Sequence, residues 1–328
     1  MAWGVAAAVF ANLCLLGFRS INKELAGDSQ VLADNASKML EGDFNSPYPL
    51  FLAIPALLSI PFANNTEIGV KLAPLFFAAV YIFGMLVLGR SLKFNNIQLA
   101  VLAVAASFPY LSPNVIALKT EVIATVFPLY IALYFVAIST RRIPVISVLF
   151  IFTLCLPFLH AQLTQAAFLF LIISAVLYIR SSYNRTLSLV LLAGLFCISV
   201  LWFREVNYLR IPAGYIMSNL HCWSAWSISV FLVHLSAIID NYDLLITGGV
   251  LFCVSILSFI KNGMNTKLMI LNFSMLVLAI FYLSYLFRAI DIYVWVGMRM
   301  RSFVYPVLVV NLVDLIFGWE GESGYVAD

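Results

Sequence analysis

The stretch LAGDSQVLADNASKMLEGDFNSPYPLF, residues 25–51, is a polar and acidic interruption in an otherwise apolar chain. Of the 328 residues, 63% are hydrophobic and only 10% are charged. A soluble globular domain has roughly a quarter of its residues charged, so this composition excludes that class. The sequence therefore predicts an all-α, polytopic membrane helical bundle in which residues 25–51 belong to the first loop outside the lipid.

About ten apolar segments are predicted to cross the membrane as helices. A transmembrane helix needs about 20 mostly apolar residues, because lipid offers no hydrogen-bond partner to the backbone. The expected spans lie near residues 1–18, 68–89, 95–111, 115–138, 143–159, 163–179, 187–203, 243–260, 268–287 and 302–318. No soluble domain or low-complexity linker separates them. Residues 1–328 are therefore expected to form a single transmembrane domain in which 19–67 is the first loop.

The basic residues of the loops predict the orientation, since loops rich in Lys and Arg stay in the cytoplasm. Alternate loops carry eight basic residues and no acidic one: Arg90, Lys93, Arg141, Arg142, Arg180, Arg185, Lys261 and Lys267. Eleven of the fifteen acidic residues fall toward the other side. We therefore expect a multi-pass protein of the cell (inner) membrane whose first loop is extracytoplasmic.

The first loop is expected to contain two helices that lie on the membrane surface. Between Val31 and Leu40 apolar residues recur at helical spacing, and Gly42 follows as a stop signal. Asp28 precedes this helix, where backbone N–H groups favour a carboxylate, and a plain N-cap is the alternative role. Residues 50–62, LFLAIPALLSIPF, are too short and too rich in Pro for a span, which favours a second interfacial helix.

Sequence motifs typical of several classes of soluble enzymes and nucleic-acid-binding proteins are absent from the chain. The chain contains no Gly-rich phosphate loop, no HExxH, no GxSxG and no long basic stretch, so a nucleic-acid partner is not expected. The five cysteines have no metal-ligand spacing and are expected to be small buried apolar residues. No cofactor or metal site follows from the residues, and a divalent cation stays an open alternative.

The first loop combines an Asp soon after the first span, Ala36, the Met39-Leu40 pair with Gly42, and Pro47 and Pro49 before an apolar run. This pattern resembles the first outer loop of the GT-C membrane glycosyltransferases. The likeness is to the lipid-phosphate-sugar-dependent group that includes the protein O-mannosyltransferases and the aminoarabinose transferase of lipid A. Three further segments fit the same pattern: SPNVIALKTEVIATVFPLYIALYFV (112–136), FLHAQLTQAAFLFLIISAVLYI (158–179) and MRMRSFVYPVLVV (298–310).

The resemblance implies an enzyme that moves a sugar from a polyprenyl-phosphate carrier to an acceptor hydroxyl on the extracytoplasmic face. Its implied partners are the lipid-linked donor, a glycan, lipid or protein acceptor, and membrane lipid. Asp28 is the implied general base, Glu121 a supporting or acceptor-binding carboxylate, and Asp34 the fallback if the register differs. The chain departs from the family pattern at Ser29, where many members have a second acidic residue, and at Ser46, where a basic residue often stands.

A carrier phosphate needs cations at the outer membrane boundary. An arginine side chain holds phosphate oxygens with a planar fork and stays charged. The candidates on the outer side are Arg288, Arg299, Arg301 and Lys23. The three arginines are expected on a short outer segment before the last span, and interfacial anchoring is the alternative for any one of them.

Two polar residues are candidates for a sugar pocket. His160 and Gln162 lie at the outer ends of two adjacent expected spans. A structural histidine at the end of the bundle is the alternative for His160.

Two other function classes stay open. A polymerase or ligase of surface polysaccharide also acts on lipid-linked sugars and would depend on outer arginines more than on Asp28. A lipid or solute transporter or flippase would show ionisable groups at mid-membrane and repeated halves with broken spans. The expected span centres are nearly free of charge, with Asp314 as the main exception, which favours surface chemistry over transport.

Overall fold

The computed structural model describes the chain except residues 1, 23, 26, 47, 108–123, 206–249, 251–252, 255, 258–259, 261–265, 275–292 and 318–328. The described regular structure is helical throughout, without a strand, which confirms the predicted all-α class. The helices are α1 (Ala2–Ile21), α2 (Asp28–Leu40), α3 (Pro49–Ser59), the 3-10 turn η1 (Ile60–Phe62), α4 (Thr66–Ser91), α5 (Asn96–Ser107), α6 (Phe127–Thr140), α7 (Ile143–Leu159), α8 (Ala161–Leu177), α9 (Ser182–Glu205) and α14 (Tyr293–Phe317).

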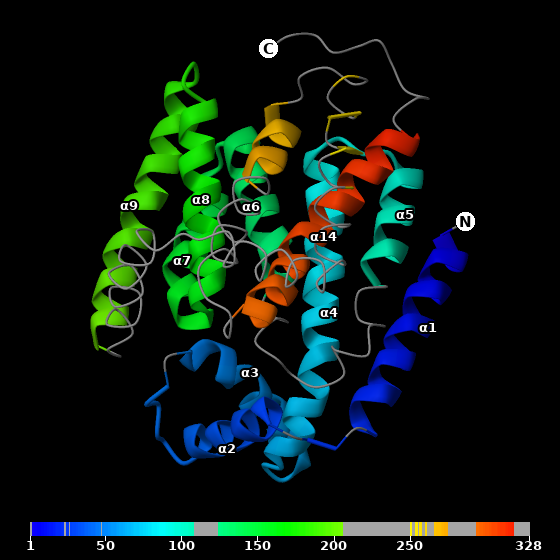
Figure 1. Cartoon of the computed structure of the whole chain (residues 1–328), viewed down its shortest axis with the longest axis vertical. Coiled ribbons are helices and arrows are strands. Elements are labelled where there is room, and N and C mark those ends of the chain that lie inside the picture. The colour runs from blue at the N-terminus through cyan, green and yellow to red at the C-terminus, as the bar shows by residue number, and fades with distance from the viewer. Residues whose placement is uncertain are drawn as a thin grey trace, which may run out of the picture.

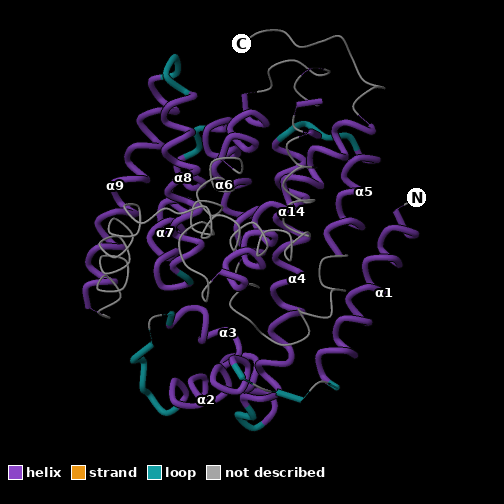
Figure 2. Tube along the Cα trace, viewed as in Figure 1, coloured by secondary structure: helices purple, strands orange, loops and turns teal. Residues whose placement is uncertain are grey.

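The long helices form an upright bundle, and two short helices lie across one of its ends. In Figure 1, α2 and α3 lie below the bundle, whereas α1 begins and α14 ends toward the opposite end. Figure 2 shows the described turns gathered at these two ends. We call them the α2–α3 end and the basic end, the latter holding Arg90, Arg141 and Arg180.

Three described helices are long and apolar enough to cross a membrane. They are Trp3–Ile21, Thr66–Ser91 and Ser182–Trp202. Shorter apolar helices occupy Pro49–Phe62, Asn96–Ser107, Ala124–Thr140, Ile143–Leu159, Ala161–Leu177 and Pro306–Phe317. Helical residues are thus described in every expected span, although 115–138, 243–260 and 268–287 are described only in part. The count of ten spans stays a prediction.

The outer surface of the bundle is apolar. Large hydrophobic side chains are exposed on helices far apart in the sequence, including Trp3, Phe10, Phe83, Ile151 and Phe196. Soluble monomers rarely expose extended apolar patches, whereas lipid tails are a suitable neighbour for them. The exposed side chains therefore support a membrane environment.

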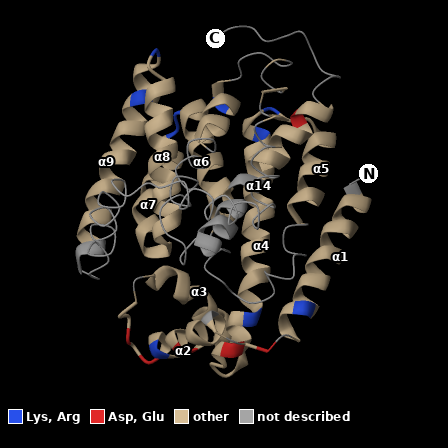
Figure 3. Cartoon of the chain, viewed as in Figure 1, with Lys and Arg blue, Asp and Glu red and all other residues tan. Residues whose placement is uncertain are grey.

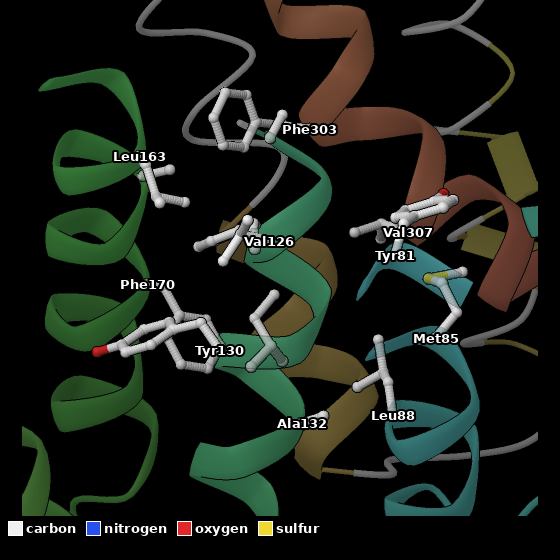
Figure 4. Close-up of a cluster of buried hydrophobic side chains, with 14 of the residues drawn as sticks. Tyr81, Met85, Leu88, Val126, Tyr130, Ala132, Leu163, Phe170, Phe303 and Val307 are labelled. Carbon is white, nitrogen blue, oxygen red and sulfur yellow. The ribbon is translucent and has the colours of Figure 1, made fainter. Parts of the chain in front are cut away.

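Aromatic rings fill the core where α6, α8 and α14 meet (Figure 4). The Phe127 ring lies 5.5 Å from that of Phe303 and 6.3 Å from that of Phe170, both edge to face. The ring of Tyr130 lies 6.3 Å from that of Phe170 in a similar arrangement. These contacts hold the first turn of α6 against the middle of α14 and of α8.

Helix α4 approaches its neighbours through glycines. A Cβ atom added at Gly84 would lie 2.7 Å from the backbone nitrogen of Leu129 on α6. One added at Gly69 would lie 2.1 Å from the carbonyl oxygen of Pro55 on α3. Small residues at helix interfaces allow such backbone contact in membrane proteins. Gly69 therefore sets how closely α3 lies against α4.

Both helices predicted in the first loop are present, but they pack on the bundle. Ala36 and Met39 of α2 are buried against Leu52 and Ala56 of α3. The second of the two predicted helices, residues 50–62, corresponds to α3 and η1. The apolar side of α2 thus contacts protein over much of its length, while Val31 of the same helix is exposed.

The start of the last described helix differs from the expectation. The last span was expected at 302–318, after an outer segment with the arginines. Helix α14 instead begins at Tyr293, so that Arg299 and Arg301 lie within the helix. The residues between Tyr293 and Pro306 contain no proline, and the apolar residues of 293–296 lie before the two arginines. Apolar length alone therefore misplaced the helix start.

The expectation for the cysteines was wrong in most described cases. Cys14, Cys197 and Cys253 are exposed and Cys155 is half-buried, while Cys222 lies outside the described residues. The outer face of a membrane helix accepts a small apolar residue as readily as the core does, because lipid is itself apolar.

We predict that Gly69→Ala destabilises the protein by about 1–3 kcal/mol, the usual cost of forcing extra volume into a packed contact. The added methyl group would clash with the Pro55 carbonyl and move α3 away from α4. Thermal unfolding of the purified protein in detergent measures the effect. Gly4→Ala on α1 is the matched control, since nothing lies within 4 Å of its Cβ position. Equal unfolding midpoints for the two variants would contradict the prediction.

Candidate functional site

Asp28 is the first residue of α2. The N-cap is Gly27, whose φ of 57° is left-handed, and no side chain caps the helix there. The alternative role of Asp28 as a plain N-cap is therefore wrong, because Gly27 occupies that position. A carboxylate in the first helical turn lies at the positive end of the helix dipole. The sequence placed the helix start three residues too late, at Val31.

Asp34 lies on the exposed surface of the same helix. Its Oδ1 atom accepts a hydrogen bond from Gln30 Nε2 at 3.2 Å. The six residues between Asp28 and Asp34 correspond to about 600° of helix rotation, so the two positions lie on different faces. Asp28 and Asp34 are thus separate candidates for the general base, because two positions on different faces of α2 do not serve one pocket in the same way.

The Pro47–Pro49 segment is joined to the α7–α8 junction by a ring contact. The ring of Tyr48 stacks on that of His160 at 4.5 Å, with an interplanar angle of 28°. Tyr48 is the N-cap of α3, and its backbone N–H donates to Ser46 Oγ at 3.2 Å. The contact brings together two sequence features that lie more than one hundred residues apart.

His160 separates α7 from α8 and is 4% exposed. Its backbone is extended, and its Nδ1 atom accepts a hydrogen bond from the backbone N–H of Gln162 at 3.2 Å. An Nδ1 atom that accepts carries no proton, so in the neutral ring the proton is on Nε2. His160 is therefore the N-cap of α8, and this capping bond at Nδ1 determines that Nε2 is the ring atom that can donate a hydrogen bond. The half-buried Gln162 follows it in the first turn.

The arginines of α14 lie toward the α2–α3 end. Helix α14 runs from Tyr293 near that end to Phe317 at the basic end (Figure 1). Arg299 is four residues before the buried Phe303 and therefore shares its face of the helix. Arg301 is two residues before Phe303, about 200° away around the helix. The structure thus distinguishes two residues that the sequence treated as a pair.

Three predicted site residues lie outside the described residues: Lys23, Glu121 and Arg288. The described chain resumes at Ala124, at the same end of α6 that contacts Phe303. The roles assigned to these three residues stay predictions.

The charges divide between the two ends of the bundle (Figure 3). Around α2 lie both signs of charge, including Asp34, Glu41, Asp43, Lys38 and Lys71. The opposite end carries basic residues and, at the end of α14, Asp314. The candidate residues of the first loop and of the α7–α8 junction therefore share the α2–α3 end, where the described carboxylates other than Asp314 lie.

Metal binding has no visible site in the part of the chain that the structure describes. Among those residues, no three His, Cys, Asp or Glu side chains gather closely enough to hold an ion.

The sequence did not assign a role to Tyr48. The local signal was its place between two prolines, which restrict the backbone around it. The partner of such a side chain cannot be read from local sequence, because His160 comes from a different helix pair.

Comparison with protein-family models, curated proteins and solved structures finds no match. The resemblance to the GT-C glycosyltransferases therefore rests on the residues of the chain itself.

We predict that Tyr48 and His160 are energetically coupled. In a double-mutant cycle of Tyr48→Leu and His160→Asn, the coupling free energy of unfolding should be about 0.5–1.5 kcal/mol, the usual value for an aromatic pair. Asn is a good N-cap, so His160→Asn removes the ring and keeps the cap. His160→Phe, which keeps a ring and loses the cap, is the complementary variant. A coupling free energy near zero would show that the stack does not join α3 to the junction.

Proposed function

We propose that this protein is a membrane glycosyltransferase that transfers a sugar from a polyprenyl-phosphate carrier to an acceptor hydroxyl. The reaction takes place at the α2–α3 end, on the extracytoplasmic face. The observation that carries the proposal is the Tyr48–His160 stack. It joins the Pro-flanked segment of the first loop, where the family resemblance is strongest, to the junction that holds the candidate sugar-pocket residues.

The position of α2 and α3 supports chemistry at a membrane boundary. Both helices lie across the end of the apolar bundle, and Leu57, Ile60 and Phe62 are exposed beside them. A polyprenyl chain requires apolar surface next to a polar site, since its phosphate and its hydrocarbon are continuous. The end of the bundle offers both kinds of surface within one segment.

Asp28 acts as the general base in this proposal. Its carboxylate accepts the proton of the acceptor hydroxyl while the acceptor oxygen forms a bond to the anomeric carbon. The bond between that carbon and the phosphate oxygen breaks, and polyprenyl phosphate leaves with the bonding electrons. The first turn of α2 places this residue at the α2–α3 end of the bundle.

Arg299 is the better candidate to bind the carrier phosphate. It shares the face of α14 that carries Phe303, which contacts α6. Arg301 occupies another face. A helix position on that face offers a less hydrated phosphate site than a position on the outward face, and hydrogen bonds to phosphate are stronger where water is scarce.

A transporter is less well supported by the described residues. Their charged side chains gather at the two ends of the bundle (Figure 3), whereas a transport path usually has ionisable groups near the middle. A polysaccharide polymerase or ligase would use the same carrier chemistry, and the base distinguishes it from the proposed transferase.

We predict that Asp28→Asn lowers turnover by about 10²-fold or more, the usual contribution of a positioned general base. Binding of the carrier should change little, because the acceptor proton is not involved in it. The assay follows release of polyprenyl phosphate from a panel of polyprenyl-phosphate-linked sugars by the purified protein in nanodiscs, with a mixture of glycan and peptide acceptors.

Asp34→Asn is the matched control, since it changes the same chemical group on the same helix at an exposed position. It should retain turnover near that of the unchanged protein. Loss in Asp34→Asn alone would place the base at Asp34. Unchanged turnover in a folded Asp28→Asn protein would remove Asp28 from the mechanism and favour the polymerase or ligase alternative.

We also predict that Arg299→Lys weakens carrier binding by about tenfold or more, because Lys lacks the planar fork. Arg301→Lys, two residues away on another face of α14, should have a smaller effect. Titration of polyprenyl-phosphate sugar against each purified variant measures the dissociation constants. Equal constants for both variants and the unchanged protein would place the phosphate site elsewhere.

A further inference from the structure

Four arginines cluster at the basic end, away from the site proposed above. Arg141 and Arg142 form the turn between α6 and α7, while Arg180 and Arg185 flank the turn between α8 and α9. All four are exposed. We call them the arginine cluster. Figure 3 shows basic residues at these two turns without an acidic one beside them.

The segment that carries the cluster contains no carboxylate. Between Glu121 and Glu205 the sequence has no Asp and no Glu. Glu205, the last residue of α9, is the one carboxylate on helices α6 to α9, and it lies at the opposite end of α9 from the arginines. The four guanidinium groups therefore attract negative charge from outside this segment.

One contact of Arg141 links the two turns. The guanidinium of Arg141 lies over the ring of Tyr183 on α9, 4.9 Å from its centre. Arg141 has a left-handed backbone, with φ of 53°, at the C-cap of α6. The Tyr183 hydroxyl is buried and has no hydrogen-bond partner among the described residues. The exposed Arg141 thus joins the α6–α7 turn to the start of α9.

Two helix starts add positive potential at the same place. Helix α7 begins directly after Arg142, and α9 begins at Ser182; neither has an acidic residue in its first turn. The free N–H groups of a helix start attract anions. Both starts thus reinforce the four side chains.

Apolar surface continues from the cluster along the helices. Ile143, Val176 and Ile179 are exposed within one or two turns of the arginines. A free anion makes no favourable contact with such apolar surface, whereas the acyl chains of a lipid would cover it. The arrangement of cations above exposed apolar residues therefore matches a lipid and not a soluble anion.

Lys267 at the same end provides a contrast. Its ammonium group donates to the Ser91 carbonyl at 2.9 Å and to Ser139 Oγ at 2.7 Å. Burial, and secondly the nearby Lys93, lowers the pKa of Lys267. This half-buried cation is hydrogen-bonded to residues near the ends of α4 and α6. The arginine cluster, by comparison, faces outward from a segment without carboxylates.

We propose that the arginine cluster binds the headgroup of an anionic phospholipid in the adjacent leaflet. The guanidinium groups hold the phosphodiester, and the exposed apolar residues of α7 and α8 contact its acyl chains. The inference rests on the membrane location supported by the apolar helices, and it does not depend on glycosyl transfer. Juxtamembrane basic residues attract anionic lipid by about 1 kcal/mol each.

The experiment uses the full chain purified in detergent and transferred to nanodiscs of phosphatidylcholine with or without phosphatidylglycerol. Native mass spectrometry measures the lipid retained, and thermal unfolding measures the stabilisation. The unchanged protein should retain phosphatidylglycerol in preference to phosphatidylcholine. The double variant Arg141→Asn with Arg185→Gln should bind it more weakly, by about fivefold for each arginine removed. Asn tolerates the left-handed backbone of position 141.

Lys93→Asn is the matched control, because Lys93 is also a cation with a left-handed backbone, φ 67°, at the basic end. It should retain the preference for phosphatidylglycerol. Equal retention of both lipids by the unchanged protein would overturn the proposal, whether or not the double variant folds. An equal loss in Lys93→Asn would show nonspecific attraction to the whole end. Stabilisation by inorganic phosphate to the same extent would show a free-anion site and also overturn the lipid assignment.

Discussion

The close approach of α3 to α4 at Gly69 is the contact on which the candidate site depends. The carbonyl oxygen of Pro55 lies where the Cβ atom of any other residue at position 69 would stand. This contact holds α3 across the end of the bundle, and α2 packs on α3 through Ala36 and Met39. Tyr48, at the start of α3, is thereby placed against His160. A side chain at position 69 would move α3 away from α4, and with it the start of α3 away from the α7–α8 junction.

Polar pairs within the bundle limit how its helices can be arranged. The side-chain amides of Asn272 and Asn311 are reciprocally hydrogen-bonded, at 3.0 and 2.6 Å. Tyr134 and Ser188 share a hydrogen bond of 2.6 Å between α6 and α9. In an apolar environment a misaligned helix would leave such groups without partners, which is costly. Apolar contacts alone do not distinguish one helix register from another, because Leu and Phe pack adequately in many arrangements.

The two ends of the bundle differ in chemistry as well as in charge. The α2–α3 end holds carboxylates, a stacked histidine and the start of α14, and it is the end where we propose that a lipid-linked substrate binds. The basic end holds cations beside helix starts and exposed apolar residues, and it has the surface to bind membrane lipid. In both cases the functional hypothesis comes from charged or polar groups placed next to an apolar boundary.

The sequence by itself determined the all-α class, the approximate positions of most helices and the division of charge between two ends. Each depends on local properties, namely runs of apolar residues and the loops that carry Lys, Arg, Asp or Glu. It misplaced the starts of α2 and α14, because helices extend past the residues that apolar length and periodicity mark. Only the tertiary structure decided that Gly27 caps α2, that Tyr48 stacks on His160, and that Arg299 and Arg301 lie on different faces of α14. These facts depend on contacts between segments distant in the chain, or on where a helix begins. Composition alone does not show where a helix begins.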